Sequence, residues 1–316
     1  MALDPQVAMH LERLAGTGFA SIHTLQPAQV REGMRRMTQR FAPGEPVQHV
    51  DNRTISTDAG DLQIRIYHPG VEGTRPVVVF FHGGGFVLGD LDTHDGLARS
   101  LAIVTDCIVV SVDYPLLPEN KYPAARNAAY AATTWVSKHA AAIGADPTQL
   151  VVAGDSAGGN LAAVVALMAR NSSGPDIAFQ LLIYPDLDFR RSNHSIQAFA
   201  GQYGNVGRDT QVWFMDHYLN SEDEKLDPLV SPLLAGDHAH LPPALVVTAE
   251  YDALRDEGEA YGLQLQRAGV DAVVMRCDGM IHEFLRWPFD ASHRALREIG
   301  HAVRDALGRR GTARRA

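Results

Sequence analysis

Short apolar runs alternate with longer helical patterns along most of the chain, and this alternation limits the folds that the sequence can adopt. Several runs are rich in Val, Ile and Leu without intervening polar residues, as in strands covered on both faces. The expected strands are Val50–Ser56, Leu62–His68, Pro76–Phe81, Cys107–Asp113, Leu150–Gly154, Phe179–Tyr184, Ala244–Glu250 and Ala272–Cys277. The expected helices among them are Leu97–Val104, Pro123–Ala142, Ala157–Ala169, Arg255–Ala268 and Ala291–Leu307. The sequence therefore predicts an α/β fold whose mostly parallel, doubly wound sheet carries helices on both faces.

Three parts of the chain depart from this alternation. No helix separates the first two expected strands, so we expect them to form an antiparallel hairpin. Residues 1–45 read as two helices, Gln6–Ala15 and Pro27–Arg40, and residues 185–230 form a long polar and aromatic insertion. Excursions of this length are too long for simple connections. We interpret 1–45 and 185–230 together as a helical cap on a single domain that spans residues 1–316.

Charge and composition exclude several classes of protein. The chain has 28 basic and 37 acidic side chains, and its net charge of -9 argues against nucleic acid as a partner. No apolar segment is long enough to cross a bilayer, and the first 25 residues lack the pattern of a signal peptide. Cys107 and Cys277 lie in apolar surroundings typical of reduced thiols. We therefore expect a cytoplasmic protein without stable membrane association.

The pentapeptide Gly154-Asp155-Ser156-Ala157-Gly158 lies between an expected strand and an expected helix. So sharp a turn forces Ser156 into strained backbone angles, and glycines on either side remove side chains that would collide. The turn lifts the Ser156 hydroxyl above the sheet edge and directs the N–H of Ala157 to the same spot. The alternative is a tight turn in which Ser156 only caps the helix. The position after a strand favours a nucleophilic serine.

A second glycine-rich stretch, His82-Gly83-Gly84-Gly85-Phe86, follows the expected strand Pro76–Phe81. Glycines leave backbone N–H groups unshielded, so that two of them can bind an oxygen that becomes negative during a reaction. We assign His82 to ordering this turn through a backbone hydrogen bond and not to proton transfer. A phosphate-binding loop is excluded, because a third glycine is needed where Leu88 stands and no Gly-Lys-Ser/Thr sequence occurs.

A serine nucleophile needs a histidine base and an orienting carboxylate, in the chain order Ser, Asp/Glu, His. His282 follows the last expected strand, at the edge of the sheet where Ser156 also lies. The other histidines after Ser156 fall in the presumed cap, in the last helix or at the wrong end of a strand; they are His194, His217, His238, His240, His293 and His301. We therefore assign the base to His282.

The carboxylate is expected at the end of the strand Ala244–Glu250. Asp252 is the first acid beyond this strand, and we choose it as the partner of His282. Glu250 and Asp256 remain as alternatives. Asp256 and Glu257 begin the next helix, where acidic side chains interact favourably with the helix dipole.

The acidic cluster Asp90-x-Asp92-x-His94-Asp95 raises the alternative of a metal site. We interpret it instead as a solvated loop that follows the glycine turn. The chemistry expected of Ser156 and His282 needs neither metal nor organic cofactor, and we predict none.

Five stretches together resemble the hormone-sensitive-lipase-like carboxylesterases, bacterial family IV of the α/β-hydrolase superfamily. The similarity runs from about Pro76 to Phe284. The stretches are His82-Gly83-Gly84-Gly85, Gly154-Asp155-Ser156-Ala157-Gly158-Gly159, Asp227-Pro228-Leu229-Val230-Ser231-Pro232, Asp252-Ala253-Leu254-Arg255-Asp256-Glu257 and His282-Glu283-Phe284. The resemblance implies an α/β-hydrolase fold, with an eight-stranded sheet and a helical cap.

The resemblance also implies roles for individual residues. The implied catalytic triad is Ser156, Asp252 and His282. The implied oxyanion hole consists of the N–H groups of Gly83, Gly84 and Ala157. The implied supporting residues near the nucleophile are His82, Gly85, Asp155 and Glu119.

One segment departs from the family pattern. Tyr114-Pro115-Leu116-Leu117-Pro118-Glu119 is similar to the family's Tyr-Arg-Leu-Ala-Pro-Glu, but Pro115 stands in place of the Arg. A charged side chain that could brace the neighbouring loop is therefore missing, and no ion pair of that Arg is carried over.

The expected activity is hydrolysis of short- to medium-chain acyl esters through an acyl-enzyme intermediate. The expected substrate is a small neutral ester, and the expected assembly is a monomer or homodimer. Hydrolysis of an amide, formamide or lactone by the same residues is an alternative. A non-catalytic receptor for a small ligand is another, although the presence of His282 argues against it.

Overall fold

The computed structural model describes residues 2–15, 21–39, 44–70, 73–204 and 207–313, and in that part eight strands form one sheet. The strands are β1 (His49–Thr57), β2 (Gly60–His68), β3 (Arg75–Phe81), β4 (Ile108–Asp113), β5 (Ala145–Asp155), β6 (Ile177–Ile183), β7 (Ala244–Tyr251) and β8 (Ala272–Ile281). Their order across the sheet is β1-β2-β4-β3-β5-β6-β7-β8. The predicted α/β fold is confirmed.

Strand directions also agree with the sequence. β1 and β2 form the predicted antiparallel hairpin, from His49 opposite His68 to Thr57 opposite Gly60. β2 is also antiparallel to β4, whereas the pairs from β4 through β3, β5, β6 and β7 to β8 are parallel. The carboxyl ends of β5, β7 and β8 therefore lie along one edge of the sheet, where parallel α/β sheets place their sites.

Apolar side chains on both faces of the sheet explain the runs without polar alternation. In β3, Val77, Val79 and Phe81 pack in one buried cluster, whereas Val78 and Phe80 pack in the other. Period-two alternation thus sends consecutive apolar residues to two different cores.

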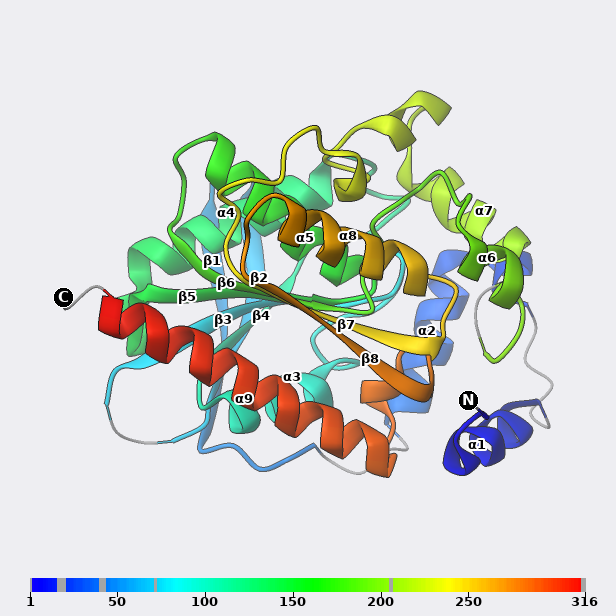
Figure 1. Cartoon of the computed structure of the whole chain (residues 1–316), viewed down its shortest axis with the longest axis horizontal. Coiled ribbons are helices and arrows are strands. Elements are labelled where there is room, and N and C mark those ends of the chain that lie inside the picture. The colour runs from blue at the N-terminus through cyan, green and yellow to red at the C-terminus, as the bar shows by residue number, and fades with distance from the viewer. Residues whose placement is uncertain (1, 16–20, 40–43, 71–72, 205–206, 314–316) are drawn as a thin grey trace.

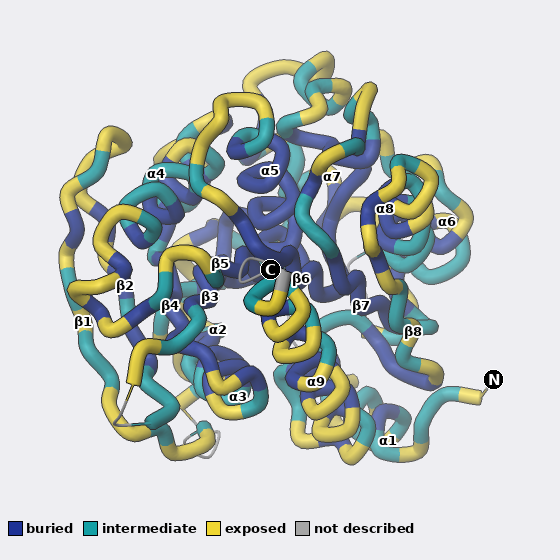
Figure 2. The backbone as a smooth tube through the Cα atoms, turned by 60° about the vertical axis from the view of Figure 1, so that its left-hand side comes forward, coloured by how far each residue is buried: buried dark blue, intermediate teal, exposed yellow. Residues whose placement is uncertain are grey.

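Helices cover both faces, as Figure 1 shows. The helices are α1 (Pro5–Ala15), α2 (Pro27–Thr38), α3 (Asp95–Thr105), α4 (Ala124–His139), α5 (Ala157–Asn171), α6 (His194–Phe199), α7 (Arg208–Tyr218), α8 (Arg255–Arg267) and α9 (Asp290–Ala313). Buried residues of α4, α5 and α8 belong to one core, and those of α3 and α9 to the other. The central strands of the sheet and the inner helix faces are buried in Figure 2, and the outer turns of α8 and α9 are exposed.

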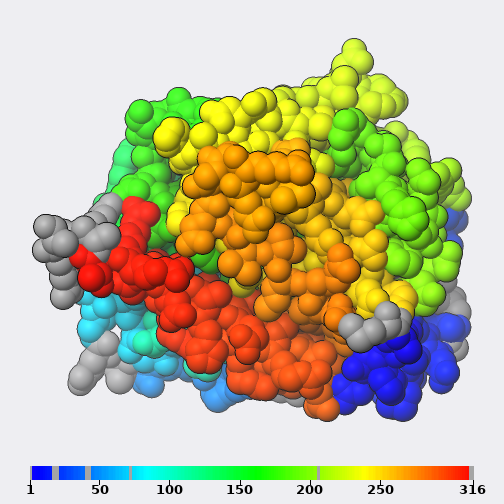
Figure 3. Space-filling model, in the orientation of Figure 1, coloured from blue at the N-terminus to red at the C-terminus, as the bar shows by residue number. Residues whose placement is uncertain are grey.

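The described parts of the segments predicted to form the cap lie beyond the carboxyl edge of the sheet in Figure 1. Within the cap, His23 is hydrogen-bonded to Thr210 of α7, with 3.2 Å between Nδ1 and Oγ1. α1 also packs on the body, where its buried Val7 joins the core and its His10 ring lies 4.0 Å from that of Trp287, and its Leu14 lines the cavity described below. Figure 3 shows α1 against the segment that precedes α9. Residues 16–20, 40–43 and 205–206 of the predicted cap lie outside the described residues.

Within the described ranges, no helix combines the length and the apolar character needed to span a membrane. The longest helix, α9, begins with an acidic first turn and carries arginine in its last turn.

Candidate active site

Ser156 lies in the strained turn that joins β5 to α5. Its φ of 55° and ψ of −119° are unusual for a residue with a side chain. A Cβ at Gly154 would lie 2.1 Å from the carbonyl oxygen of Gly158, and one at Gly158 would lie 1.9 Å from that of Phe81. No side chain fits at such distances. The turn therefore needs both glycines, as the sequence predicted.

Three side chains from three strand ends meet at this turn. Nε2 of His282 lies 3.0 Å from the Ser156 hydroxyl, and Nδ1 of His282 lies 2.8 Å from a carboxylate oxygen of Asp252. The other Asp252 oxygen accepts a hydrogen bond from the N–H of Leu254 at 2.8 Å. β8 runs to Ile281, four residues beyond the predicted end, so His282 directly follows the strand. The arrangement can draw a proton from the serine hydroxyl and hold the resulting positive charge beside a carboxylate.

The charge state of His282 depends on Asp252. Burial favours the neutral imidazole, but the adjacent Asp252 carboxylate outweighs it and raises the pKa of His282 to about 9. Asp252 itself is buried and hydrogen-bonded, which fixes its orientation. The pair is therefore built to stabilise an imidazolium.

The glycine stretch corrects one predicted assignment. The N–H of Gly83 donates to the Asp155 carboxylate at 2.9 Å, so it is already occupied and cannot serve the expected oxyanion hole. Gly84 and Gly85, both with positive φ, line the cavity together with Ser156. Of the expected donors Gly83 and Gly84, only Gly84 therefore lies in the cavity wall, with Gly85 beside it.

His82 is buried beneath the glycine loop and orders it. Its Nδ1–H donates to the carbonyl of Gly83 at 2.9 Å, and its ring stacks on Tyr114 with 4.3 Å between centroids. Tyr114 in turn donates its hydroxyl to the carbonyl of His82. Burial and the nearby His94 lower the pKa of His82 to about 4, so the ring is neutral at pH 7.

The interpretation of the acidic cluster as a solvated loop holds for the exposed Asp92 but not for His94. His94 is buried, and its Nε2 lies 3.6 Å from the Asp155 carboxylate that holds Gly83. Burial opposes the charge of Asp155, yet His94 holds the pKa of this carboxyl below its usual range. His94 precedes Leu97 and Leu101 at helical spacing, and this pattern could have placed it on the buried face of α3.

Glu119, expected as a supporting residue near the nucleophile, forms an ion pair with the cap. Its half-exposed carboxylate pairs with Arg31 of α2 through two hydrogen bonds of 2.9 Å. Arg31 also donates to the carbonyl of Val87 at 2.7 Å. The pair joins the cap to the loop that follows the glycines.

Glu257 lies in the first turn of α8, as predicted, and is buried with 1% exposure. Its carboxylate accepts hydrogen bonds from the main chain of Leu187 and Asp188. Neither periodicity nor motif spacing indicates these contacts, because they depend on how the insertion after β6 folds back.

A cavity of about 410 Å³ opens at Ser156 and His282. Its apolar lining comes from the cap and the glycine loop and includes Leu25, Val30, Met34, Phe86, Leu88 and Phe214. Among the charged residues that line it, Arg191 pairs with Asp186, Arg286 with Glu283 and His282 with Asp252. Among the described residues, no group of three or more His, Cys, Asp or Glu side chains is placed to hold a metal ion.

Known proteins share this architecture over most of its length. A family model described as alpha/beta hydrolase fold matches residues 78–286. The carboxylic ester hydrolase LipN of Mycobacterium tuberculosis is 43% identical over 293 residues, which cover 90% of this chain and 77% of that protein. An arylesterase of Saccharolobus solfataricus is 33% identical over 308 residues, which cover 96% of this chain and 99% of that protein.

A solved structure gives the same result. The hyperthermophilic esterase of the archaeon Pyrobaculum calidifontis is 38% identical and superimposes with a TM-score of 0.91, covering 96% of this chain and 99% of that chain. As its motifs predicted, the chain belongs to the hormone-sensitive-lipase-like branch of the alpha/beta-hydrolase family.

Proposed function

We propose that the protein is a serine carboxylesterase in which Ser156 attacks the ester carbonyl and forms an acyl-enzyme. The observation that carries this proposal is the hydrogen-bonded series from Ser156 through His282 to Asp252 at the wall of a mostly apolar cavity. The named relatives are carboxylic ester hydrolases and esterases, which supports the same reaction class.

In the acylation step, neutral His282 accepts the Ser156 proton at Nε2 while Oγ forms a bond to the carbonyl carbon. Asp252 stabilises the imidazolium and keeps the Nδ1 proton directed to itself, so that Nε2 stays free to accept. The imidazolium then gives its proton to the departing alcohol. In the second step, His282 activates a water molecule that releases the acid and restores Ser156.

We assign the oxyanion hole to the N–H groups of Gly84, Gly85 and Ala157. Gly84 and Gly85 belong to the cavity wall beside Ser156, and Ala157 is the first residue of α5. The first N–H groups of a helix have no partner within the helix and lie at the positive end of its dipole. Donors held by a rigid turn stabilise the developing negative charge without reorganisation.

The lining of the cavity supports a small neutral ester as the substrate. Each charged side chain named in the wall already has an opposite partner, so a charged ligand would find little net attraction. Apolar side chains of α2 and α7 favour hydrocarbon, and the cavity volume limits its length. A receptor without catalysis is not favoured, because Ser156 and His282 are in contact.

A series of p-nitrophenyl esters from acetate to palmitate tests this function. We expect kcat/KM to peak between the butanoyl and octanoyl esters and to fall for longer chains, because the cavity of about 410 Å³ cannot enclose them. The matched amide, p-nitroanilide butanoate, measures the amidase alternative. Failure to hydrolyse every ester, or faster turnover of the amide than of the ester, would contradict the proposal.

The pH dependence follows from the raised pKa of His282. Only the neutral imidazole accepts a proton, so kcat/KM for a neutral ester is expected to rise about tenfold per pH unit and to level off near pH 9. Acid release in a pH-stat measures the profile, and the Ser156→Ala variant supplies the background of alkaline hydrolysis. A profile that is flat between pH 6 and pH 9 would contradict the raised pKa of His282.

A further inference from the structure

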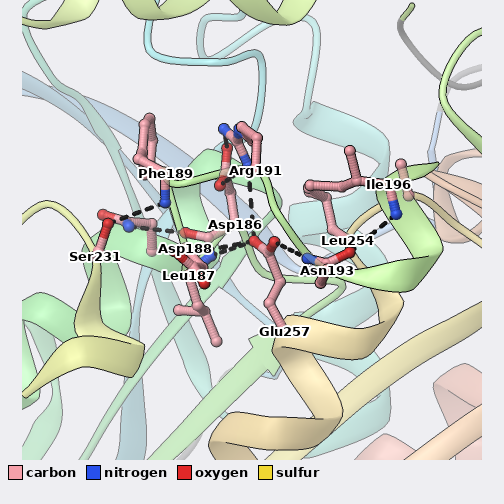
Figure 4. Close-up of polar contacts among 12 residues, drawn as sticks. Asp186, Leu187, Asp188, Phe189, Arg191, Asn193, Ile196, Ser231, Leu254 and Glu257 are labelled. Carbon is pink, nitrogen blue, oxygen red and sulfur yellow. Dashed lines mark hydrogen bonds and ion pairs between the residues drawn. The ribbon is translucent and has the colours of Figure 1, made fainter. Parts of the chain in front are cut away.

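A buried polar network joins the beginning of the insertion after β6 to the first turn of α8. Its centre is Glu257, which is 1% exposed. Glu257 Oε1 accepts the N–H of Leu187 at 2.7 Å and that of Asp188 at 3.2 Å, and Oε2 accepts the side-chain amide of Asn193 at 2.9 Å. Figure 4 shows these groups converging on the carboxylate. One α8 side chain therefore binds three positions of the insertion.

Arg191 extends this network to the wall of the cavity. Its guanidinium forms two hydrogen bonds of 2.7 Å with Asp186, lies 4.5 Å above the ring of Phe189 and stands 3.7 Å from Glu257. Its φ of 55° is unfavourable for a residue with a side chain, so the surrounding contacts must hold it. Asp186, Phe189 and Arg191 all line the cavity.

The same segment touches the nucleophile and the acid loop. The N–H of Asp186 donates to the carbonyl of Ser156 at 3.2 Å. On the other side, Ser195 donates its hydroxyl to the carbonyl of Ala253 at 2.7 Å and its N–H to the carboxylate of Asp256 at 2.8 Å. Residues 186–195 thus contact both the turn at Ser156 and the loop that begins at Asp252.

We infer that Glu257 is a positioning residue for ester hydrolysis. It keeps the cavity wall and the loop that begins at Asp252 in fixed positions relative to each other, without touching the substrate. This inference rests on the proposed function. Without Glu257, the N–H groups of Leu187 and Asp188 lose their shared acceptor, and the segment that carries Phe189 and Arg191 can shift against α8. A displacement of about 1 Å at reacting groups costs on the order of 100-fold in rate.

Hydrogen-bond geometry, more than charge, gives Glu257 this role. The charged groups around it are Asp186, Arg191, and Asp188 with its partner Arg190. Burial and the neighbouring Asp186 raise the pKa of Glu257 well above its usual range, although Arg191 opposes this shift. A neutral side chain of the same shape should therefore replace much of its function.

The test compares Glu257→Leu with Glu257→Gln on p-nitrophenyl butanoate. We expect Glu257→Leu to lower kcat about 100-fold and to raise KM severalfold. The rise of kcat/KM with pH that reports the ionisation of His282, here called its pH limb, should move to lower pH. The kcat falls because Asp252 is held less firmly against His282, and KM rises because the wall loosens. Glu257→Gln keeps the acceptor for Leu187 and Asp188 and loses only the bond from the Asn193 amide, so it should stay within about fivefold of wild type, with an unmoved limb.

Glu259→Leu is the matched control. It removes a carboxylate two positions away on α8 that pairs with Arg276 at the surface, and it should leave kcat, KM and the pH limb unchanged. If Glu257→Leu does not fold, Glu257→Asp replaces it, because the shorter carboxylate cannot reach Leu187 and Asp188 together.

The outcomes separate the inference from the function on which it rests. A folded Glu257→Leu or Glu257→Asp variant with wild-type kcat and pH limb overturns the positioning role. Equal losses in the Gln and Leu variants also overturn it, because they would point to charge. A wild-type protein that hydrolyses no ester overturns the proposed function instead.

Discussion

Ser156→Ala is expected to lower kcat on p-nitrophenyl butanoate by about 10⁵- to 10⁶-fold. The variant keeps the cavity and the N–H donors of the glycine loop but has no oxygen to attack the carbonyl. A residual rate above that of water is expected from those donors alone. Active-site titration with a fluorophosphonate checks the same point directly, because it labels wild type with one phosphonyl group per chain and leaves the variant unlabelled.

The substitution should not disturb the fold. Alanine carries the same Cβ as serine, so the backbone strain at φ 55° is unchanged. The variant loses one hydrogen bond, to His282, which is worth about 1 kcal/mol. Ser172→Ala, on the exposed turn after α5, is the control and should keep full activity. A Ser156→Ala protein that retains more than a tenth of wild-type turnover would refute the role of Ser156.

The fold could be predicted because its signals are local. Each apolar run became a strand, and the hairpin of β1 and β2 followed from the missing helix between them. The turn at Ser156 could be predicted because a glycine stands on either side of the serine between a strand and a helix, although the contact that excludes a side chain at Gly158 is made with Phe81 of β3. The position of α1 on the body depends on contacts with β8 and Trp287, which no local pattern specifies.

The positions of the catalytic candidates could be predicted from their order along the chain and from the strands that they follow. Ser156, Asp252 and His282 were placed after β5, β7 and β8, and their side chains do meet there. The sequence could not show that the N–H of Gly83 is already bound, because adjacent glycines look alike in sequence and only the Asp155 carboxylate distinguishes Gly83.

The burial of ionisable residues could not be predicted from the sequence. His94 and Glu257 look like surface residues in sequence, since charged side chains are rarely buried without partners. Their partners, Asp155 for His94 and the segment after β6 for Glu257, lie far away along the chain. Such long-range pairs become visible only when the fold brings the segments together.

Asp252→Asn is expected to lower kcat about 10⁴-fold while the shape of the site is kept. The new side-chain amide can donate to Nδ1 of His282, and the neutral ring then carries its proton on Nε2, which faces Ser156. In that tautomer, His282 cannot accept the serine proton. The amide oxygen can still accept the N–H of Leu254, which donates to the Asp252 carboxylate at 2.8 Å in the wild-type protein, so the loop should stay folded. Asp271→Asn, an exposed substitution, is the control for loss of one carboxylate.

The same variant separates two effects of the Asp252 carboxylate on His282, the rise in the pKa of the ring and the choice of the ring nitrogen that carries the proton. Without Asp252 the desolvation of the ring is unopposed, so the pKa of His282, raised to about 9 in wild type, should fall below its usual value. NMR titration of isotope-labelled histidine measures this shift, and kcat/KM measures the consequence. If Asp252 acted only by holding a proton on the ring, Asp252→Asn would be more active than wild type at pH 7, because more of its imidazole would be neutral. The tautomer argument requires the opposite, a large loss at pH 7 that persists at pH 10.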